Sequence, residues 1–140
     1  MATEVTSAHA SAQVTETRAG KFQDEVQAGG ISFLADEPAG LGGLGTGPSP
    51  YDLLCAALGA CTSMTVRLYA DQKGWPLTRI SVKVGNTPKT ATTKDKFLRE
   101  ITFEGALDET QRARLMQIAE RCPVHRTLSE GSEIETHMAG

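Results

Sequence analysis

The chain has few aromatic residues, few cysteines and no excess of positive charge. Aromatic side chains make up 5% of its 140 residues, with a single tryptophan, so a base-stacking surface for single-stranded nucleic acid is not expected. Lysine and arginine number 14 against 17 aspartates and glutamates, which gives a net charge of −3. Because nucleic-acid backbones are bound through clustered Lys and Arg, we expect no nucleic-acid partner.

The sequence also lacks a long apolar run and a secretion signal. No uninterrupted apolar run approaches the ~20 residues that span a bilayer, so we expect no transmembrane helix and no membrane partner. The N-terminal segment MATEVTSAHASAQ has neither a basic region nor an apolar stretch, which predicts no signal peptide. The expected location is therefore cytoplasmic, where free thiols stay reduced unless they carry out redox chemistry or bind metal.

The pattern of elements predicts an α+β fold. We expect a flexible N-terminal tail over residues 1–12 and a single domain over residues 13–140, a length that can bury a sizeable core. The predicted elements are three short strands within 13–35, a long helix over 50–73, strands over 77–86 and 97–104, a helix over 109–121, a helical turn over 123–128 and a strand over 132–138. This order favours antiparallel sheets over a parallel α/β arrangement.

The long helix is the clearest prediction. Ser49 is a suitable N-cap, Pro50 fits the first helical position, and Asp52 lies in the first turn, where the helix dipole favours a carboxylate. Gly74 fits the position just beyond the helix end. At ~1.5 Å per residue the helix is about as long as a small domain is wide, so we expect it at the centre of the fold.

A Gly/Pro-rich loop over residues 36–50 precedes this helix. Its segment Gly40-Leu41-Gly42-Gly43-Leu44-Gly45 is formally a G-x-G-x-x-G. That motif binds dinucleotides when it opens a helix directly after a strand within a βαβ unit, and this context is missing. We therefore interpret the segment as a flexible lid or linker.

Three cysteines are too few and too scattered for a disulfide scaffold. Cys61 lies in the small-residue centre of the long helix, where a core thiol is the simplest interpretation. Cys122 stands beside Arg121, His125 and Arg126, and neighbouring cations lower a thiol pKa. Cys55 is six residues before Cys61 and cannot bond to it within a helix, so we interpret Cys55 as a core residue. A redox pair would be Cys61–Cys122 or Cys55–Cys122.

Other chemistry has weaker signals. Cys122-Pro123-Val124-His125 is a C-x-x-H, but a zinc site would have to borrow Cys61 and a further ligand. A Cys–His hydrolase lacks an evident third residue to orient the histidine. The chain has no G-x-S-x-G elbow, which disfavours a serine hydrolase.

Two segments together resemble the OsmC/Ohr family. The first is Gly47-Pro48-Ser49-Pro50-Tyr51-Asp52-Leu53-Leu54 leading into Ala56-Ala57-Leu58-Gly59-Ala60-Cys61, which is similar to the family's active-site helix. The second is Arg121-Cys122-Pro123-Val124-His125-Arg126-Thr127-Leu128, the second cysteine motif. The order of elements also agrees over about residues 12–138, and the chain looks most like OsmC-like proteins of unassigned physiology.

The resemblance implies a fold and an activity. The implied fold is an intertwined homodimer with antiparallel sheets wrapped around long central helices. The implied activity is thiol-dependent reduction of organic hydroperoxides in oxidative or osmotic stress defence, with Cys61 as peroxidatic and Cys122 as resolving residue. A dithiol, such as the lipoyl group of a lipoyl protein, would be the reductant, and no metal or organic cofactor is required.

A cation is expected to offset the burial of Cys61, because burial raises a thiol pKa. Family enzymes use an arginine from the N-terminal β-region, and Arg18 is the position that best matches. In the hydroperoxide-resistance branch an acid ten residues before the first cysteine orients this arginine. Here that position is Tyr51, and the acid is Asp52, about 100° further round the helix.

Two other functions stay open. An OsmC-like dimer with weak peroxidase activity could bind a hydrophobic small ligand in an apolar pocket near Cys61. A zinc module could use Cys61, Cys122 and His125.

Overall fold

The computed structural model describes residue 5 and residues 8–140, and it divides the chain into two compact units. One unit comprises residues 1–53 with 135–140, and the other comprises residues 54–134. Each unit has its own antiparallel sheet. The tail predicted over residues 1–12 falls partly outside the described residues, at 1–4 and 6–7.

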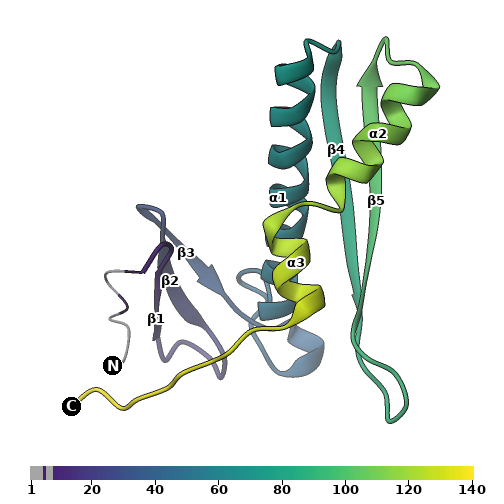
Figure 1. Ribbon diagram of the computed structural model, residues 1–140. Helices are drawn as coiled ribbons and strands as arrows, with labels where there is room; N and C mark the ends of the chain where they lie inside the picture. The colour runs from purple at the N-terminus through teal and green to yellow at the C-terminus, as the bar shows by residue number, and fades with distance from the viewer. Residues whose placement is uncertain (1–4, 6–7) are drawn as a thin grey trace. The chain divides into compact units, whose positions relative to one another are not determined.

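The first unit is built on a three-stranded meander. Its strands β1 (Ala12–Glu16), β2 (Asp24–Ala28) and β3 (Ile31–Ala35) pair in chain order (Figure 1), as the sequence predicts. Gly29 and Gly30 make the tight turn between β2 and β3 with φ of 59° and 78°. Two consecutive positive φ angles match the right-handed twist of a hairpin, and glycine adopts them without strain.

The Gly/Pro-rich loop is organised around one carboxylate rather than being the flexible lid or linker that we expected. Asp36 is 2% exposed and accepts hydrogen bonds from the backbone N–H groups of Glu37 (2.8 Å), Leu44 (3.2 Å) and Thr46 (3.3 Å). The Thr46 hydroxyl donates a further bond of 2.6 Å. This hydroxyl bond, with the backbone bonds, holds the pKa of Asp36 below its ordinary value.

Two of the loop glycines allow close approach of the backbone. A Cβ at Gly43 would collide with the carbonyl of Glu37, and one at Gly47 would collide with the carbonyl of Leu34. Neither obstacle is the end of a flexible side chain, so these positions require glycine for space. A Cβ at Gly40 in the same loop would meet no other atom within 4 Å, so that position has no such requirement.

Helix α1 (Pro50–Lys73) has the predicted bounds. The Ser49 backbone N–H donates to Asp52 at 2.9 Å, and the Asp52 backbone N–H donates to the Ser49 hydroxyl at 3.1 Å. This reciprocal pair satisfies two amides that a helix start leaves free. Gly74 follows the helix with φ of 68°, the left-handed conformation typical of a helix end.

The second unit adds a hairpin and two helices to α1. The hairpin strands are β4 (Leu77–Thr87) and β5 (Lys96–Gly105), and the helices are α2 (Glu109–Ala119) and α3 (Pro123–Glu130). Asp108 caps α2 as predicted, in a capping box with Gln111. Helix α2 stops two residues before the predicted end at Arg121, and α3 is a full helix rather than a turn.

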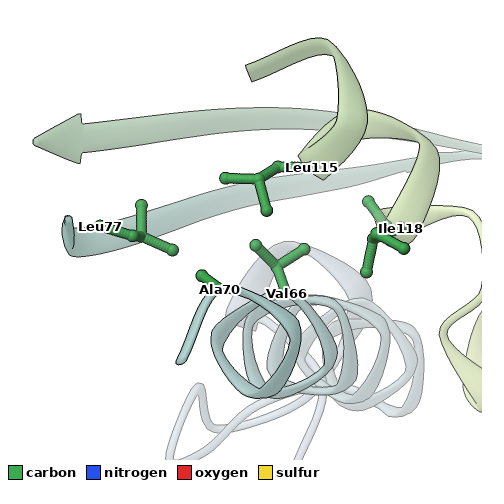
Figure 2. Close-up of a cluster of buried hydrophobic side chains, with 6 residues drawn as sticks. Val66, Ala70, Leu77, Leu115 and Ile118 are labelled. Carbon is green, nitrogen blue, oxygen red and sulfur yellow. The ribbon is translucent and has the colours of Figure 1, made fainter. Parts of the chain in front are cut away.

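The core of the second unit lies between α1, α2 and the hairpin (Figure 1). Figure 2 shows Leu115 and Ile118 of α2 facing Val66 and Ala70 of α1. The buried residues of α1 recur every fourth position and are Leu58, Thr62, Val66 and Ala70. Burial of each large apolar side chain contributes roughly 1.5–3 kcal/mol, so this stripe fixes how α2 lies on α1.

Helix α1 is long and apolar enough to cross a membrane, with a mean hydropathy of 1.4 over 18 residues, and it is the one such helix among the described residues. The sequence predicts no such helix, because small and polar residues interrupt every apolar run. Length and composition of this kind also occur in core helices of soluble proteins. In the single chain 22% of that window is buried, and Val66 and Ala70 of the buried stripe pack on α2.

The strand predicted over residues 132–138 is wrong. The segment has no regular structure, and Ile134 and Met138 are 90% and 89% exposed. Alternating side chains alone do not make a strand, because a strand requires a partner for its backbone hydrogen bonds.

The loop geometry predicts that alanine substitutions at two glycines differ in their effect on stability. Gly43→Ala should lower the free energy of unfolding by about 1–3 kcal/mol, since the backbone has to move to admit the Cβ. Gly40→Ala is the matched control and should change it by less than about 0.5 kcal/mol. Urea unfolding followed by circular dichroism measures both, and equal effects at the two positions would contradict the rigid-loop interpretation.

Candidate functional site

Both candidate reactive cysteines lie in the second unit. Cys61 stands in the middle of α1, one position before Thr62 of the buried stripe. This position places it at the border of the stripe, and it is half-buried. Cys122 is completely buried, with an exposed fraction of 0%.

The junction between α2 and α3 positions Cys122 for local reasons. Pro123 occupies the first position of α3, where its missing N–H removes no hydrogen bond. Cys122 is the N-cap of α3, and its Sγ accepts a hydrogen bond from the backbone N–H of His125 at 3.4 Å. The sulfur therefore takes the place that a serine or aspartate oxygen usually fills at a helix start.

The two thiols interact with each other. Burial raises the pKa of the Cys61 thiol above its ordinary value of 9.0, and a hydrogen bond with the Cys122 thiol raises that pKa further. The backbone N–H of Val124 and the hydroxyl of Thr65 act in the opposite direction, because they donate hydrogen bonds that favour the thiolate. The first turn of α3 thus offers one amide to each sulfur, from Val124 to Cys61 and from His125 to Cys122.

An arginine with a largely buried side chain contacts residues next to this pair. The side chain of Arg99 on β5 is 11% exposed and donates to the Thr62 hydroxyl at 2.9 Å and to the Ala119 carbonyl at 3.3 Å. Its other terminal nitrogen lies 3.0 Å from Nδ1 of His125 and 3.5 Å from a carboxylate oxygen of Glu120. Arg99 of β5 therefore contacts residues that are close in sequence to both cysteines.

Arg99 was not among the residues predicted from the sequence, although the sequence carries a signal for it. The inward-facing positions of β5 alternate as Phe97, Arg99, Ile101 and Phe103. A charged residue on an otherwise apolar face is costly to bury unless it has partners. Those partners come from α1 and from both sides of the helix junction, so their identity depends on the tertiary fold.

Arg18 and Asp52, predicted to activate Cys61, both lie in the first unit. Arg18 is exposed in the turn after β1, with φ of 67°. Asp52 is bound in the cap of α1, where the backbone N–H and hydroxyl of Ser49 lower its pKa. No ion pair joins Arg18 to Asp52 among residues 5 and 8–140. Because Cys61 belongs to the other unit, the roles of both residues towards it stay predictions.

The remaining candidates are placed as follows. Cys55 is half-buried on α1. Arg126 is paired with Glu130 at 3.7 Å. In the part of the chain that is described, no three His, Cys, Asp or Glu side chains gather as a set of metal ligands, so the zinc interpretation has no ligand set there.

The first unit has a hollow of about 600 Å3 along its sheet. Its lining residues are Val5, residues 11–13 and residues 27–32. None of the predicted site residues lines it, so it lends no support to an apolar ligand pocket beside Cys61.

Comparisons with known proteins agree with this arrangement. The family model described as OsmC-like protein matches residues 43–137, which include both cysteines. No curated protein matches the chain. Several solved structures share its fold, at identities too low to carry anything beyond the fold.

An OsmC-like protein from Mycoplasma pneumoniae aligns with a TM-score of 0.74 and 17% identity, over 88% of this chain and 89% of that one. An organic hydroperoxide resistance protein OsmC from Legionella pneumophila aligns with a TM-score of 0.64 and 22% identity, over 87% and 90%. An organic hydroperoxide resistance protein from Elizabethkingia anophelis gives 0.64 and 18%, over 86% and 88%. With a family match over most of its length and the fold in common, this α+β chain belongs to the OsmC-like protein family.

Proposed function

We propose that this protein is a two-cysteine peroxidase that reduces organic hydroperoxides in oxidative or osmotic stress defence. The observation that carries the proposal is that Cys122 lies close enough to Cys61 to raise its pKa, in a member of this family. The Legionella and Elizabethkingia neighbours are named for organic hydroperoxide resistance, which is consistent with the proposal.

The reaction balances with these two thiols. The Cys61 thiolate attacks the terminal oxygen of the hydroperoxide, the O–O bond breaks, and the alcohol leaves after taking a proton. Cys61 is then a sulfenic acid. The Cys122 sulfur attacks the Cys61 sulfur, water leaves, and a disulfide forms. A dithiol restores both thiols by exchange and is itself oxidised to a disulfide.

Three further features belong to the proposal. The reductant is a dithiol such as a lipoyl group, which supplies the two electrons without a metal or organic cofactor. The protein acts in the cytoplasm, where such dithiols are kept reduced. Its substrate is a hydroperoxide with an apolar body, since the α1 surface near Cys61 is apolar.

The protein is also proposed to act as a homodimer. Met64 and Leu68 follow Cys61 on α1, at successive helical spacings of three and four, and they are 70% and 61% exposed. Large apolar side chains on one face of a central helix are typical of an interface between subunits. A second copy of α1 would cover this face and the flank of Cys61.

A hydrophobic ligand-binding dimer with weak peroxidase activity is the second candidate. The raised pKa of Cys61 favours it, because a thiol of this kind holds little thiolate at neutral pH. Native mass spectrometry of gently purified protein distinguishes the two, since a binding protein retains its ligand.

The peroxidase proposal predicts different failures at the two cysteines. Cys61→Ser should reduce consumption of cumene hydroperoxide to the rate without protein, because the attacking sulfur is gone. Cys122→Ser should consume one equivalent and stop at the sulfenic acid. Peptide mass spectrometry of the wild type should show loss of two hydrogens at a Cys61–Cys122 link, and Cys55→Ser, the control on the same helix, should behave like the wild type. Multiple turnovers in Cys61→Ser would overturn the assignment.

The thiol environment predicts a pH profile. Because the pKa of Cys61 is raised, its thiolate fraction should increase about tenfold for each pH unit from neutrality until that pKa is reached. Thr65→Val removes a hydrogen bond that lowers this pKa, so the profile should move to higher pH and the neutral rate should fall severalfold. Alkylation of Cys61 by iodoacetamide, quantified by peptide mass spectrometry, measures both. A shift towards lower pH in Thr65→Val would contradict this account.

The exposed face of α1 predicts the oligomeric state. The wild type should sediment at twice the mass of one chain, and the double variant Met64→Glu/Leu68→Glu should sediment as a monomer, because charges cannot be buried without partners. Met116→Glu replaces an exposed apolar residue of α2 (46% exposed) and serves as the control. A monomeric wild type would overturn the dimer proposal.

A further inference from the structure

Arg99 is a largely buried cation, and its guanidinium contacts four named residues of the second unit. Its side chain faces inward on β5 among Phe97, Ile101 and Phe103, and 11% of it is exposed. Removing an arginine from water at such a place is unfavourable unless its donors are satisfied. The guanidinium is a rigid planar fork with five donors, so its hydrogen bonds also fix the positions of the groups that accept them.

The accepting groups lie on both sides of Cys122 in the sequence and next to Cys61. Thr62, at 2.9 Å, is the neighbour of Cys61 on α1. The Ala119 carbonyl, at 3.3 Å, is three residues before Cys122, and His125, at 3.0 Å, is three residues after it. One side chain therefore connects the Thr62 hydroxyl, next to Cys61, to both ends of the helix junction that carries Cys122.

The hydrogen-bond partners of His125 assign its tautomer, that is, which ring nitrogen carries the proton. Arginine is a donor only, so Nδ1 of His125, 3.0 Å from Arg99 Nη2, must be the unprotonated, accepting nitrogen. The proton is then on Nε2, which donates to the Glu120 carboxylate at 3.2 Å. His125 is held at both ring nitrogens, and its own backbone N–H is directed at the Cys122 sulfur.

The resolving step, in which Cys122 forms a disulfide with Cys61, depends on how the two residues are positioned. A disulfide forms only when the two Cα atoms are within about 4.4–6.8 Å and the side chains are correctly directed. A displacement of about 1 Å between reacting groups can lower a rate by about a hundredfold. The contacts of Arg99 are with Thr62, Ala119, Glu120 and His125, so any influence on the sulfurs passes through these residues.

We propose that Arg99 is a positioning residue that holds Cys122 against Cys61, so that the disulfide forms faster than the sulfenic acid is oxidised further. This inference rests on the proposed function for the peroxide step. The bond that Arg99 promotes is the Cys61–Cys122 disulfide, formed with loss of water from the sulfenic acid. Attack of Cys61 on the hydroperoxide precedes that step. The junction acts on it in two opposing ways, because the Cys122 thiol raises the pKa of Cys61 and the Val124 amide lowers it.

The matched control is another arginine of the same unit. Arg112 on α2 also satisfies its side chain with backbone carbonyls, those of Phe103 (2.9 Å), Gly105 (3.2 Å) and Leu107 (3.4 Å). These partners belong to the end of β5 and the turn between β5 and α2, away from the junction that carries Cys122. Arg112→Met therefore removes a comparable set of hydrogen bonds without touching the groups beside the thiols.

The experiment compares Arg99→Met, Arg99→Lys and Arg112→Met after one equivalent of cumene hydroperoxide. In Arg99→Met, dimedone trapping should show sulfenic acid at Cys61 forming within about threefold of the wild-type rate, while disulfide formation slows at least about tenfold. A second equivalent of cumene hydroperoxide should then oxidise this sulfenic acid to sulfinic acid. Arg99→Lys should recover only part of the loss, because lysine lacks the planar fork. Arg112→Met should resolve at the wild-type rate.

A second measurement keeps the test independent of peroxide chemistry. Equilibration of the thiol pair with lipoamide and dihydrolipoamide measures how readily the Cys61–Cys122 disulfide forms. The equilibrium constant should fall at least about tenfold in Arg99→Met and stay unchanged in Arg112→Met. If the wild type formed no sulfenic acid, the proposed function would fail, whereas the lipoamide equilibrium would still decide the role of Arg99.

Two results would overturn the role of Arg99. One is disulfide formation in folded Arg99→Met at the wild-type rate and with the wild-type equilibrium constant. The other is an equal loss in Arg112→Met, which would indicate general destabilisation. If circular dichroism shows that Arg99→Met is unfolded, Thr62→Val removes one acceptor of Arg99 with little change of shape, and the same slowing of resolution is expected of it.

Discussion

The packing of α2 on the buried stripe of α1 determines where the rest of the second unit lies. Val66 and Ala70 accept Leu115 and Ile118 from α2, and the carbonyl of Ala119 at the end of α2 shares the guanidinium of Arg99 with Thr62 of α1. Cys122 follows within three residues of that end. The contact of two cysteines that are far apart in the sequence is therefore a consequence of apolar packing between two helices.

Opposing effects act on the pKa of the Cys61 thiol. Burial and the neighbouring Cys122 thiol both favour the neutral form, while the Val124 amide and the Thr65 hydroxyl favour the thiolate. The result is a raised pKa, so the donors only partly offset burial. A site of this kind relies on the proximity of its second thiol more than on a highly ionised first one. Asp52, which we expected to orient an arginine towards Cys61, has its carboxylate engaged in the cap of α1, where it accepts a hydrogen bond from the Ser49 backbone N–H.

Sequence patterns predicted the elements that depend on local signals. The bounds of α1 follow from Ser49, Asp52 and Gly74, and the cap of α2 follows from Asp108. The cysteine pair came from a resemblance to a family, because the spacing in the chain left Cys55 open as a partner of Cys122. The Asp36-centred loop and the partners of Arg99 depend on groups brought together by tertiary structure. The strand prediction over 132–138 was wrong for the converse reason. The alternation of side chains is a local pattern, whereas a strand also needs a partner from elsewhere in the chain.

The complete burial of Cys122 determines which sulfur of the disulfide a reductant would attack in the proposed cycle. In that cycle, a dithiol arriving from solvent would reach the half-buried Cys61 rather than the buried Cys122. The mixed disulfide then forms on Cys61, and Cys122 is the leaving group. The His125 backbone N–H, which already donates a hydrogen bond to this sulfur, would stabilise the departing thiolate. One backbone N–H would thus assist Cys122 as a nucleophile during oxidation and as a leaving group during reduction.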